Sequence, residues 1–281
     1  MKIISIINHK GGVGKTTFTG CTAQALALVG FRVLAIDNDS QHNLSMMLGT
    51  GVISPGIRDV YKAAADQASE VFLRSIRTTE LPGLHIITSC SSLCNSDIEN
   101  TLALKLCMQK CRLERYYDYV LIDNAPGLDR LQASAIWACD AIFVPTELKQ
   151  FAVDGLVELA TVLKEQFSTA APITRIIPNF FRDTKRHNGF IAALNALFPG
   201  KVTQTVIPLD PVFDEVITAG KILFLHRLAS KGAAFYLKLI HELFDMEEEK
   251  VWELVIDKRN DRRTEDLRDR FQQQRAGPTQ P

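Results

Sequence analysis

The sequence predicts an α/β fold in which a mostly parallel, doubly wound sheet carries helices on both faces. Short apolar runs rich in β-branched residues alternate along the chain with longer segments of helical pattern, as in repeated βα units. The short runs are almost continuously hydrophobic, which is typical of strands that helices cover on both sides. A length of 281 residues is enough for one large domain with a substantial core.

Seven runs have the length and composition of strands, and four longer segments have the pattern of helices. The expected strands span residues 2–8, 32–37, 84–88, 119–123, 141–145, 174–178 and 202–207. The expected helices span residues 16–29, 97–115, 153–167 and 189–197. Because no repeat or low-complexity linker interrupts this alternation, we expect a single domain over residues 1–245.

The composition changes at the end of the chain, where residues 246–281 are dense in charges of both signs. Val251, Trp252, Leu254, Val255 and Ile256 give the first part of this segment apolar side chains that can dock on the core. The remainder is typical of a solvated helix that frays through the final prolines. We therefore expect a charged C-terminal helix or tail after the domain.

The bulk composition is that of a globular protein in water, with 46% hydrophobic and 23% charged residues. The formal net charge is +0, so binding to nucleic acid would require a local basic patch rather than global attraction. No export signal opens the sequence, and no apolar run approaches the roughly 18 residues of a membrane span. These observations favour a cytoplasmic protein without a stable membrane association.

Two cysteine pairs, Cys90/Cys94 and Cys107/Cys111, have the i,i+4 spacing that would place each pair on one helix face. Such a pair can chelate a metal ion. However, histidine is absent from this stretch after His85, and cysteine is a common small core residue in reducing compartments. We therefore favour free thiols over a zinc site.

The most informative motif follows the first expected strand and consists of Lys10, Gly11, Gly12, Val13, Gly14, Lys15, Thr16 and Thr17. Its glycines allow successive N–H groups to point at phosphate oxygens, and the following helix adds the positive end of its dipole. We expect Lys15 to reach the β- and γ-phosphates and the Thr16 hydroxyl to complete a Mg²⁺ shell. The pattern departs from the usual P-loop, because His9 replaces its first glycine and a second lysine, Lys10, opens the loop.

Carboxylates end two of the other expected strands. Asp123 closes the apolar run 119–123 in the Walker-B form, in which the aspartate holds Mg²⁺ directly or through water. Asp39 follows the second expected strand, at the edge of the sheet where ligands bind in this architecture. We expect Asp39 to position or activate the attacking water and to help order Mg²⁺. In the alternative interpretation, Asp39 or Ser40 only caps the next helix.

At these residues the chain resembles the ParA/MinD family of deviant Walker-A P-loop ATPases, and more specifically its ParA-type partitioning branch. The resemblance covers most of residues 1–245. It rests on residues 10–17, on Asp37-x-Asp39-x-Gln41-x-Asn43, on residues 118–123 with Pro126, and on Pro145 followed by Gly155. Later matches are Ile177-Pro178-Asn179, Val206-Ile207-Pro208, Glu215 and Ala219-Gly220-Lys221.

The resemblance implies a mechanism that the motifs alone do not show. In this family two ATP-bound subunits form a face-to-face sandwich, and the residue matching Lys10 reaches the partner's phosphates. An extra fixed cation at the transferring phosphoryl group has the electrostatic effect of an arginine finger. The same resemblance implies that Asn179, Pro208 and Asp210 contact the adenine, with ATP and Mg²⁺ as the cofactors.

The resemblance also implies partners. ParA-type dimers bind duplex DNA without sequence preference, which would make this protein nucleoid-associated, and a ParB-type or cargo adaptor protein stimulates hydrolysis. Candidate phosphate contacts are basic and late in the chain: Arg182, Lys185, Arg186, Lys221, Arg227, Lys231 and Lys238. The alternative is that these residues form an ordinary solvated basic surface.

Two departures from the family pattern fall in the loops around the nucleotide. Ser40 stands where the family usually has proline, and Ala125 replaces the first of two prolines after Asp123. Neither substitution removes a group that does chemistry, but both affect the stiffness of these loops.

Two other branches that share this P-loop remain as alternatives. A MinD-like membrane-cycling ATPase needs a C-terminal amphipathic helix, and the end of this chain offers only Leu267 and Phe271 as an apolar pair. An iron–sulfur carrier needs cysteines placed at the dimer interface, and no C-x-x-C occurs. A positioning ATPase for a protein cargo remains compatible with all of these motifs.

Overall fold

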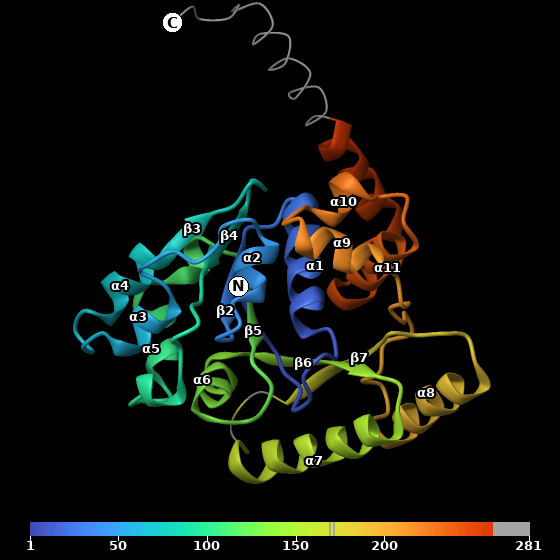
Figure 1. Ribbon diagram of the computed structural model, residues 1–281, viewed down its shortest axis with the longest axis horizontal. Helices are drawn as coiled ribbons and strands as arrows, with labels where there is room; N and C mark the ends of the chain where they lie inside the picture. The colour runs from blue at the N-terminus through green and yellow to red at the C-terminus, as the bar shows by residue number, and fades with distance from the viewer. Residues whose placement is uncertain (169, 171, 261–281) are drawn as a thin grey trace, which may run out of the picture.

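A seven-stranded sheet forms the centre of the computed structural model, which describes residues 1–168, 170 and 172–260 (Figure 1). The strands are β1 (Lys2–Ile6), β2 (Val33–Asn38), β3 (Ile76–Thr78), β4 (Leu84–Ile87), β5 (Tyr119–Asn124), β6 (Ala141–Glu147) and β7 (Ile173–Asn179). Their order across the sheet is β3-β4-β2-β5-β1-β6-β7. All of these pairings are parallel except that of β3 with β4, so the prediction of a mostly parallel sheet is confirmed.

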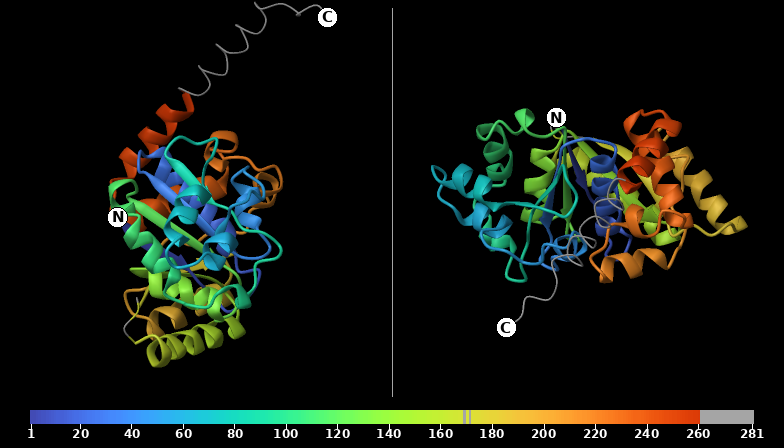
Figure 2. Two further views of the ribbon diagram at one scale, coloured as in Figure 1. Left: turned by 90° about the vertical axis from the view of Figure 1, so that its left-hand side faces the viewer. Right: turned by 90° about the horizontal axis from the view of Figure 1, so that it is seen from above.

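Helices cover both faces of the sheet, and Figure 2 shows the two groups on either side of it. One group packs on the face that buries Ile4 and Ile6 and consists of α1 (Lys15–Leu28), α2 (Asn43–Met47), α9 (Val212–Thr218), α10 (Leu223–His226) and α11 (Lys231–Phe244). The other packs on the face that buries Ile3 and consists of α3 (Ile57–Lys62), α4 (Ala68–Ser75), α5 (Ala103–Lys110), α6 (Arg130–Ala138), α7 (Gln150–Gln166) and α8 (Lys185–Leu197). Neighbouring residues of β1 point to opposite faces, which explains why one strand supplies both cores. The sheet is therefore doubly wound, as the sequence predicts.

The register of the central strands decides where polar groups meet. β1 lies between β5 and β6, and β5 lies between β1 and β2. Asp37 of β2 is paired with Asp123 of β5, and Asn38 with Asn124. Because parallel strands end at the same edge of a sheet, these four side chains gather beside the loop that follows β1.

Residues 202–207 were expected to form a strand, and this prediction is wrong. The segment touches β7 only at its ends, where Thr203 N donates to Ile176 O and Ile207 N to Pro178 O. Between these points, the Glu242 carboxylate accepts hydrogen bonds from the backbone N–H groups of Gln204 and Thr205 at 2.7 and 2.8 Å. A side chain of α11 thus takes the donors that a strand would offer to β7.

The single helix expected over residues 97–115 is also wrong. The structure has two short 3-10 helices, η1 (Asn95–Asp97) and η2 (Leu113–Arg115), on either side of α5. Asn100 Oδ1 accepts a hydrogen bond from Leu102 N at 2.9 Å, which forms a turn just before α5. Arg112 has a φ of +50°, which ends the helix after Cys111. The short edge strand β3 was not predicted, because three residues give no usable pattern.

The described C-terminal residues pack on the domain. Residues 248–260 are helical, and Val251 and Val255 are fully buried in the core that α1 and α11 share. The predicted end of the domain at residue 245 falls on Asp245, whose φ of +52° ends α11. That boundary remains a prediction, and residues 261–281 of the predicted tail lie outside the described residues. None of the helices described here combines the length and apolar character that a membrane crossing requires.

Val255 provides a test of this docking. We expect Val255→Asp to lower the free energy of unfolding by about 3 kcal/mol or more, because it puts a carboxylate in an apolar core. Ile256, the next residue, is 43% exposed, so Ile256→Asp is the matched control and should change stability by less than about 0.5 kcal/mol. Urea unfolding of both variants measures the difference, and equal midpoints would show that the segment does not dock in solution.

Candidate nucleotide-binding site

The loop between β1 and α1 lines a cavity of about 390 Å³ at the carboxyl edge of the sheet. The residues of the predicted motif that line it are Gly12, Gly14, Lys15, Thr16 and Thr17. Gly14 has a φ of +88°, and a Cβ there would lie 2.1 Å from Asn179 Nδ2. Only glycine therefore fits this position, where the chain turns from the loop into α1.

Lys15 points into the curve of the loop. Its Nζ donates hydrogen bonds to Lys10 O at 2.9 Å and to Asn8 O at 3.3 Å, and the residue is 7% exposed. Burial lowers the pKa of Lys15, while the carboxylates of Asp123 and Asp39 act in the opposite direction. The loop thus holds an ammonium group where the phosphates of a nucleotide would enter.

Asp123 accepts two hydroxyl hydrogen bonds from the first turns of α1. Thr16 Oγ1 donates to Asp123 Oδ2 at 2.7 Å, and Thr19 Oγ1 lies 3.1 Å from Asp123 Oδ1. Burial raises the pKa of Asp123 to about 7, and the neighbouring Asp37 carboxylate adds to this shift. A hydroxyl and a carboxylate oxygen in contact are hard ligands of the kind that Mg²⁺ prefers, so Thr16 and Asp123 fit the metal role predicted for them.

Thr19 was missed by the sequence analysis, although it stands three residues after Thr16 and therefore on the same face of α1. Its hydroxyl also donates to Lys15 O at 2.9 Å, so it shares its hydrogen bond between the helix backbone and Asp123. Thr19 is fully buried, and its contact helps to orient the Asp123 carboxylate.

Asp37 and Asp39 have different surroundings. Asp37 is fully buried, and its Oδ2 accepts hydrogen bonds from Ser45 N at 2.8 Å and Ser45 Oγ at 2.7 Å. Burial raises the pKa of Asp37 to about 6 in spite of these bonds. Asp39 lines the cavity and accepts a hydrogen bond from Gln41 N at 2.9 Å. Asp37 thus holds the segment after β2, and Asp39 faces the space where a nucleotide would lie.

The predicted adenine contacts are partly brought together. Asn179 lines the cavity, and its Nδ2 donates to Val13 O at 2.9 Å. Asp210 also lines it, but its two carboxylate oxygens accept hydrogen bonds from Val212 N and Gly232 N. Pro208 is buried and lies outside the cavity lining, which its neighbours Ile207 and Leu209 join instead.

Tyr236 of α11 forms part of the same wall and was not found from the sequence. It is fully buried, its ring packs edge-to-face on Phe213 with 5.5 Å between centroids, and it lines the cavity. Its hydroxyl has no hydrogen-bond partner among the described residues. A buried hydroxyl without a partner costs about 1–3 kcal/mol.

Lys10 points out of the loop, and it is not one of the residues that line the cavity. Its Nζ lies 3.5 Å from Glu147 Oε1 and 5.8 Å from the centre of the Phe151 ring, which is 77% exposed. Lys149 pairs with the other oxygen of Glu147 at 2.7 Å. The two lysines of the motif therefore differ, because Lys15 serves its own loop and Lys10 lies at the protein surface.

The candidate DNA contacts are all exposed and fall on two groups of elements. Arg182, Lys185 and Arg186 lie at and before the start of α8, and the others lie on or beside α9, α10 and α11, namely Lys221, Arg227, Lys231 and Lys238. Arg227 forms an ion pair with Glu215, which occupies part of its donor capacity.

The two cysteine pairs differ in local structure. Cys107 lies in α5, and Cys111 N donates to Cys107 O at 2.9 Å, so this pair has the helical spacing that the sequence predicts. Cys90 and Cys94 lie in the loop before η1 rather than on a helix. All six cysteines are free thiols. In the described ranges, no group of three or more His, Cys, Asp or Glu side chains is placed to hold a metal ion.

Comparison with known proteins agrees with this geometry. A family model described as an AAA domain matches residues 1–173. The chain is 32% identical over 260 residues to the chromosome partitioning protein ParA of Caulobacter vibrioides, covering 89% of this chain and 96% of that protein. It is 30% identical over 252 residues to the sporulation initiation inhibitor protein Soj of Bacillus subtilis, covering 86% and 98%.

Solved structures extend the similarity to the three-dimensional fold. The septum site-determining protein MinD from Pyrococcus horikoshii, complexed with Mg-ADP, has a TM-score of 0.71 at 26% identity and covers 86% of this chain and 95% of its own. The cell division ATPase MinD from Pyrococcus furiosus has a TM-score of 0.73 at 25% identity, with coverages of 88% and 99%. The matched domain, the near full-length relatives and the lysine-first P-loop together show that this chain belongs to the ParA/Soj family of P-loop ATPases.

Proposed function

We propose that this protein is a ParA-type ATPase that dimerises around ATP, binds duplex DNA without sequence preference and positions a cargo with a ParB-type or cargo adaptor partner. The observation that carries the proposal is that the side chains of the two lysines in one loop point in different directions. Lys15 faces its own cavity, and Lys10 faces the surface. A lysine that opens a phosphate-binding loop but turns away from it is available to the phosphates of a second subunit.

ATP and Mg²⁺ are the proposed ligands of the cavity. The loop N–H groups, the α1 dipole and Lys15 would bind the phosphates, while Thr16, Asp123 and Asp39 would hold the cation or its waters. Bound Mg²⁺ would neutralise charge that develops on the phosphates. Asp39 is placed to orient the water that attacks the γ-phosphorus, which yields ADP and phosphate. The Mg-ADP in the similar MinD structure supports this assignment.

The base would lie towards Asn179, Ile207, Leu209, Phe213 and Tyr236. Apolar side chains with a few polar groups are the usual surroundings of a nucleobase. Asn179 keeps one Nδ2 hydrogen free after its bond to Val13 O, and the Tyr236 hydroxyl is without a protein partner. Asn179 can therefore give a hydrogen bond to the base without breaking a bond of the protein, and we propose that the Tyr236 hydroxyl becomes accessible when nucleotide binds.

DNA binding is proposed for the exposed basic residues of α8 and of the α9–α11 region. Phosphate contacts of this kind release counterions, so affinity would fall steeply with salt. With a net charge of +0 the protein has no general attraction to DNA, and dimerisation would be needed to double the local basic surface. A MinD-like membrane-cycling ATPase is the second candidate, because two MinD structures share the fold.

Lys10→Ala tests the dimer. We expect this variant to bind ATP–Mg²⁺ within about twofold of the wild type, but to lose ATP-dependent dimerisation and retention on random-sequence duplex DNA. Light scattering and DNA retention with no nucleotide, ADP or ATP–Mg²⁺ provide the measurement. Lys149→Ala is the matched control, because Lys149 pairs with the same Glu147 carboxylate. Normal dimerisation of the Lys10 variant would refute the sandwich. A wild type that dimerises with ATP but is not retained on DNA would favour the membrane candidate.

Asp123→Asn tests the cost of the buried acid. The pKa of Asp123 is about 7 in the nucleotide-free protein, above the ordinary value of about 4. A raised pKa means that stability is greatest below the ordinary value and is lost as pH rises through 7. We therefore expect Asp123→Asn to stabilise the empty protein by about 2–4 kcal/mol at pH 8 and little at pH 4, while it abolishes Mg²⁺-dependent hydrolysis.

Thermal unfolding without nucleotide at several pH values measures this effect. Asp118→Asn is a control of opposite sign, since the Arg32 guanidinium lowers the pKa of Asp118 and the substitution removes a favourable ion pair. A stability gain for Asp123→Asn that does not depend on pH would contradict the proposed cause.

Tyr236→Phe tests the base end of the cavity. Removing a hydroxyl that lacks a partner should leave the stability of the empty protein unchanged or raise it by about 1 kcal/mol. If the nucleotide satisfies this hydroxyl, its loss should weaken ADP–Mg²⁺ binding about three- to tenfold, as measured by calorimetry. An unchanged dissociation constant would remove Tyr236 from the binding site.

A further inference from the structure

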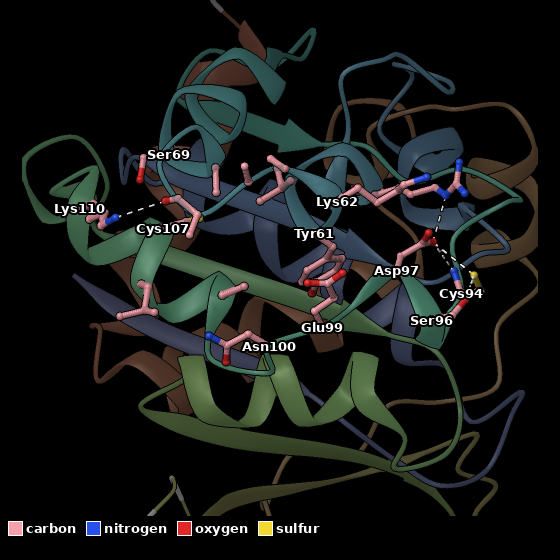
Figure 3. A pocket seen from close by; sticks show the side chains of 18 residues that line it. Tyr61, Lys62, Ser69, Cys94, Ser96, Asp97, Glu99, Asn100, Cys107 and Lys110 are labelled. Carbon is pink, nitrogen blue, oxygen red and sulfur yellow. Dashed lines mark hydrogen bonds and ion pairs between the residues drawn. The ribbon is translucent and has the colours of Figure 1, made fainter.

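A second cavity, of about 740 Å³, lies between α3, α4, η1 and α5 (Figure 3). It is larger than the nucleotide cavity, shares no lining residue with it, and opens on the face of the sheet opposite to α1. Its volume lies within the range of sites that bind small organic molecules. None of the residues proposed above for nucleotide or DNA binding lines it.

Part of the cavity lining is apolar, and polar and charged side chains make up the rest. The ring of Tyr61 and the side chain of Val60 come from α3, and Leu106 comes from α5. Small side chains leave the space between them empty: Ala63, Ala64, Ala65, Ala68 and Ala103. An apolar ligand body would therefore remove much hydrophobic surface from water, at roughly 25 cal/mol per Å².

The cavity lining carries one more positive than negative side chain. Arg58 pairs with Asp97 at 3.0 Å, so these two charges are already compensated. Lys62 makes no hydrogen bond or ion pair with any described residue, and Lys110 Nζ donates only a long bond of 3.4 Å to Ala65 O. Glu99 is the remaining carboxylate in the lining. Two ammonium groups against one carboxylate favour a ligand that carries one negative charge.

The floor of the cavity is joined to the nucleotide site by buried hydrogen bonds. Tyr61 Oη donates to Asn38 Oδ1 at 3.0 Å, and Asn38 Nδ2 donates to Asn124 Oδ1 at 2.9 Å. Asn38 stands between Asp37 and Asp39, and Asn124 directly follows Asp123. A ligand that moves the Tyr61 ring would therefore act on the strand ends that carry the acidic residues.

We propose that this cavity is an effector site for a small organic monoanion with an apolar body, and that its occupancy changes nucleotide affinity through Tyr61 and Asn38. The proposed anion binding depends on the cavity alone. The proposed coupling to nucleotide affinity rests on the nucleotide site proposed above. By linkage, nucleotide changes the affinity for the anion by the same factor.

Fluorescence titration with 8-anilinonaphthalene-1-sulfonate, an aromatic monoanion, tests the proposed anion binding. We expect one saturable site, and about fivefold weaker binding or more when Lys62→Ala and Lys110→Ala are combined. Lys105→Ala is the matched control, because Lys105 is an exposed lysine of α5 outside the cavity lining. Ala64→Trp should also weaken binding by filling the cavity. Equal affinity in all variants, or complete loss of signal with saturating ADP–Mg²⁺, would overturn the proposal.

Calorimetry of ADP–Mg²⁺ binding with and without saturating probe tests the proposed coupling. We expect the probe to change the dissociation constant at least threefold in the wild type and to have no effect in Tyr61→Phe, which keeps the ring but breaks the bond to Asn38. Tyr61→Phe must still bind the probe, and its thermal unfolding shows whether it is folded. Probe binding without any shift in the wild type would refute the coupling. A wild type that binds the probe but no nucleotide would refute the proposed function and leave the anion site standing.

Discussion

The carboxyl edge of the sheet has to accommodate four buried ionisable side chains, those of Lys15, Asp37, Asp39 and Asp123, and the surrounding structure is arranged around that constraint. The parallel register of β2 and β5 places Asp37 beside Asp123, and Lys15 approaches from the loop after β1. Burial raises the pKa of Asp37 to about 6 and that of Asp123 to about 7, and a neighbouring carboxylate adds to each shift, Asp39 at Asp37 and Asp37 at Asp123. The fold compensates only in part, because desolvation of a carboxylate outweighs a few hydrogen bonds.

The two acids are compensated in different ways, and this difference separates a structural role from a chemical one. Asp37 accepts hydrogen bonds from the backbone and side chain of Ser45, so its charge is committed to the segment after β2. Asp123 is held by two threonine hydroxyls, which can turn their hydrogens elsewhere when a cation arrives. A divalent cation bound there would offset the cost of burying Asp123, and folding energy would in this way contribute to affinity for the metal.

The motifs and most strands could be predicted because their signals are local. The P-loop, Asp123 and Asp39 are read from a few consecutive residues. Six of the seven expected strands are confirmed, because their short length and β-branched residues favour a buried strand over a buried helix. Two of the failures involve distant residues. Residues 202–207 do not form a strand, because the Glu242 carboxylate accepts hydrogen bonds from their backbone N–H groups. Tyr236 lines the nucleotide cavity because α11 packs on Phe213. No window of sequence contains both members of such a pair.

The surface position of Lys10 would allow one loop to serve both the monomer and the proposed dimer. Lys10 is 36% exposed and lies 3.5 Å from Glu147, so this ion pair contributes little, about 0–1 kcal/mol. If Lys10 moves away from Glu147, Glu147 still forms its closer ion pair with Lys149, so no carboxylate is left without a partner. The same ammonium group placed against phosphates in a closed interface would interact in a much lower dielectric. The equilibrium between the two arrangements would then be decided by whether a γ-phosphate is present rather than by the contact that Lys10 gives up.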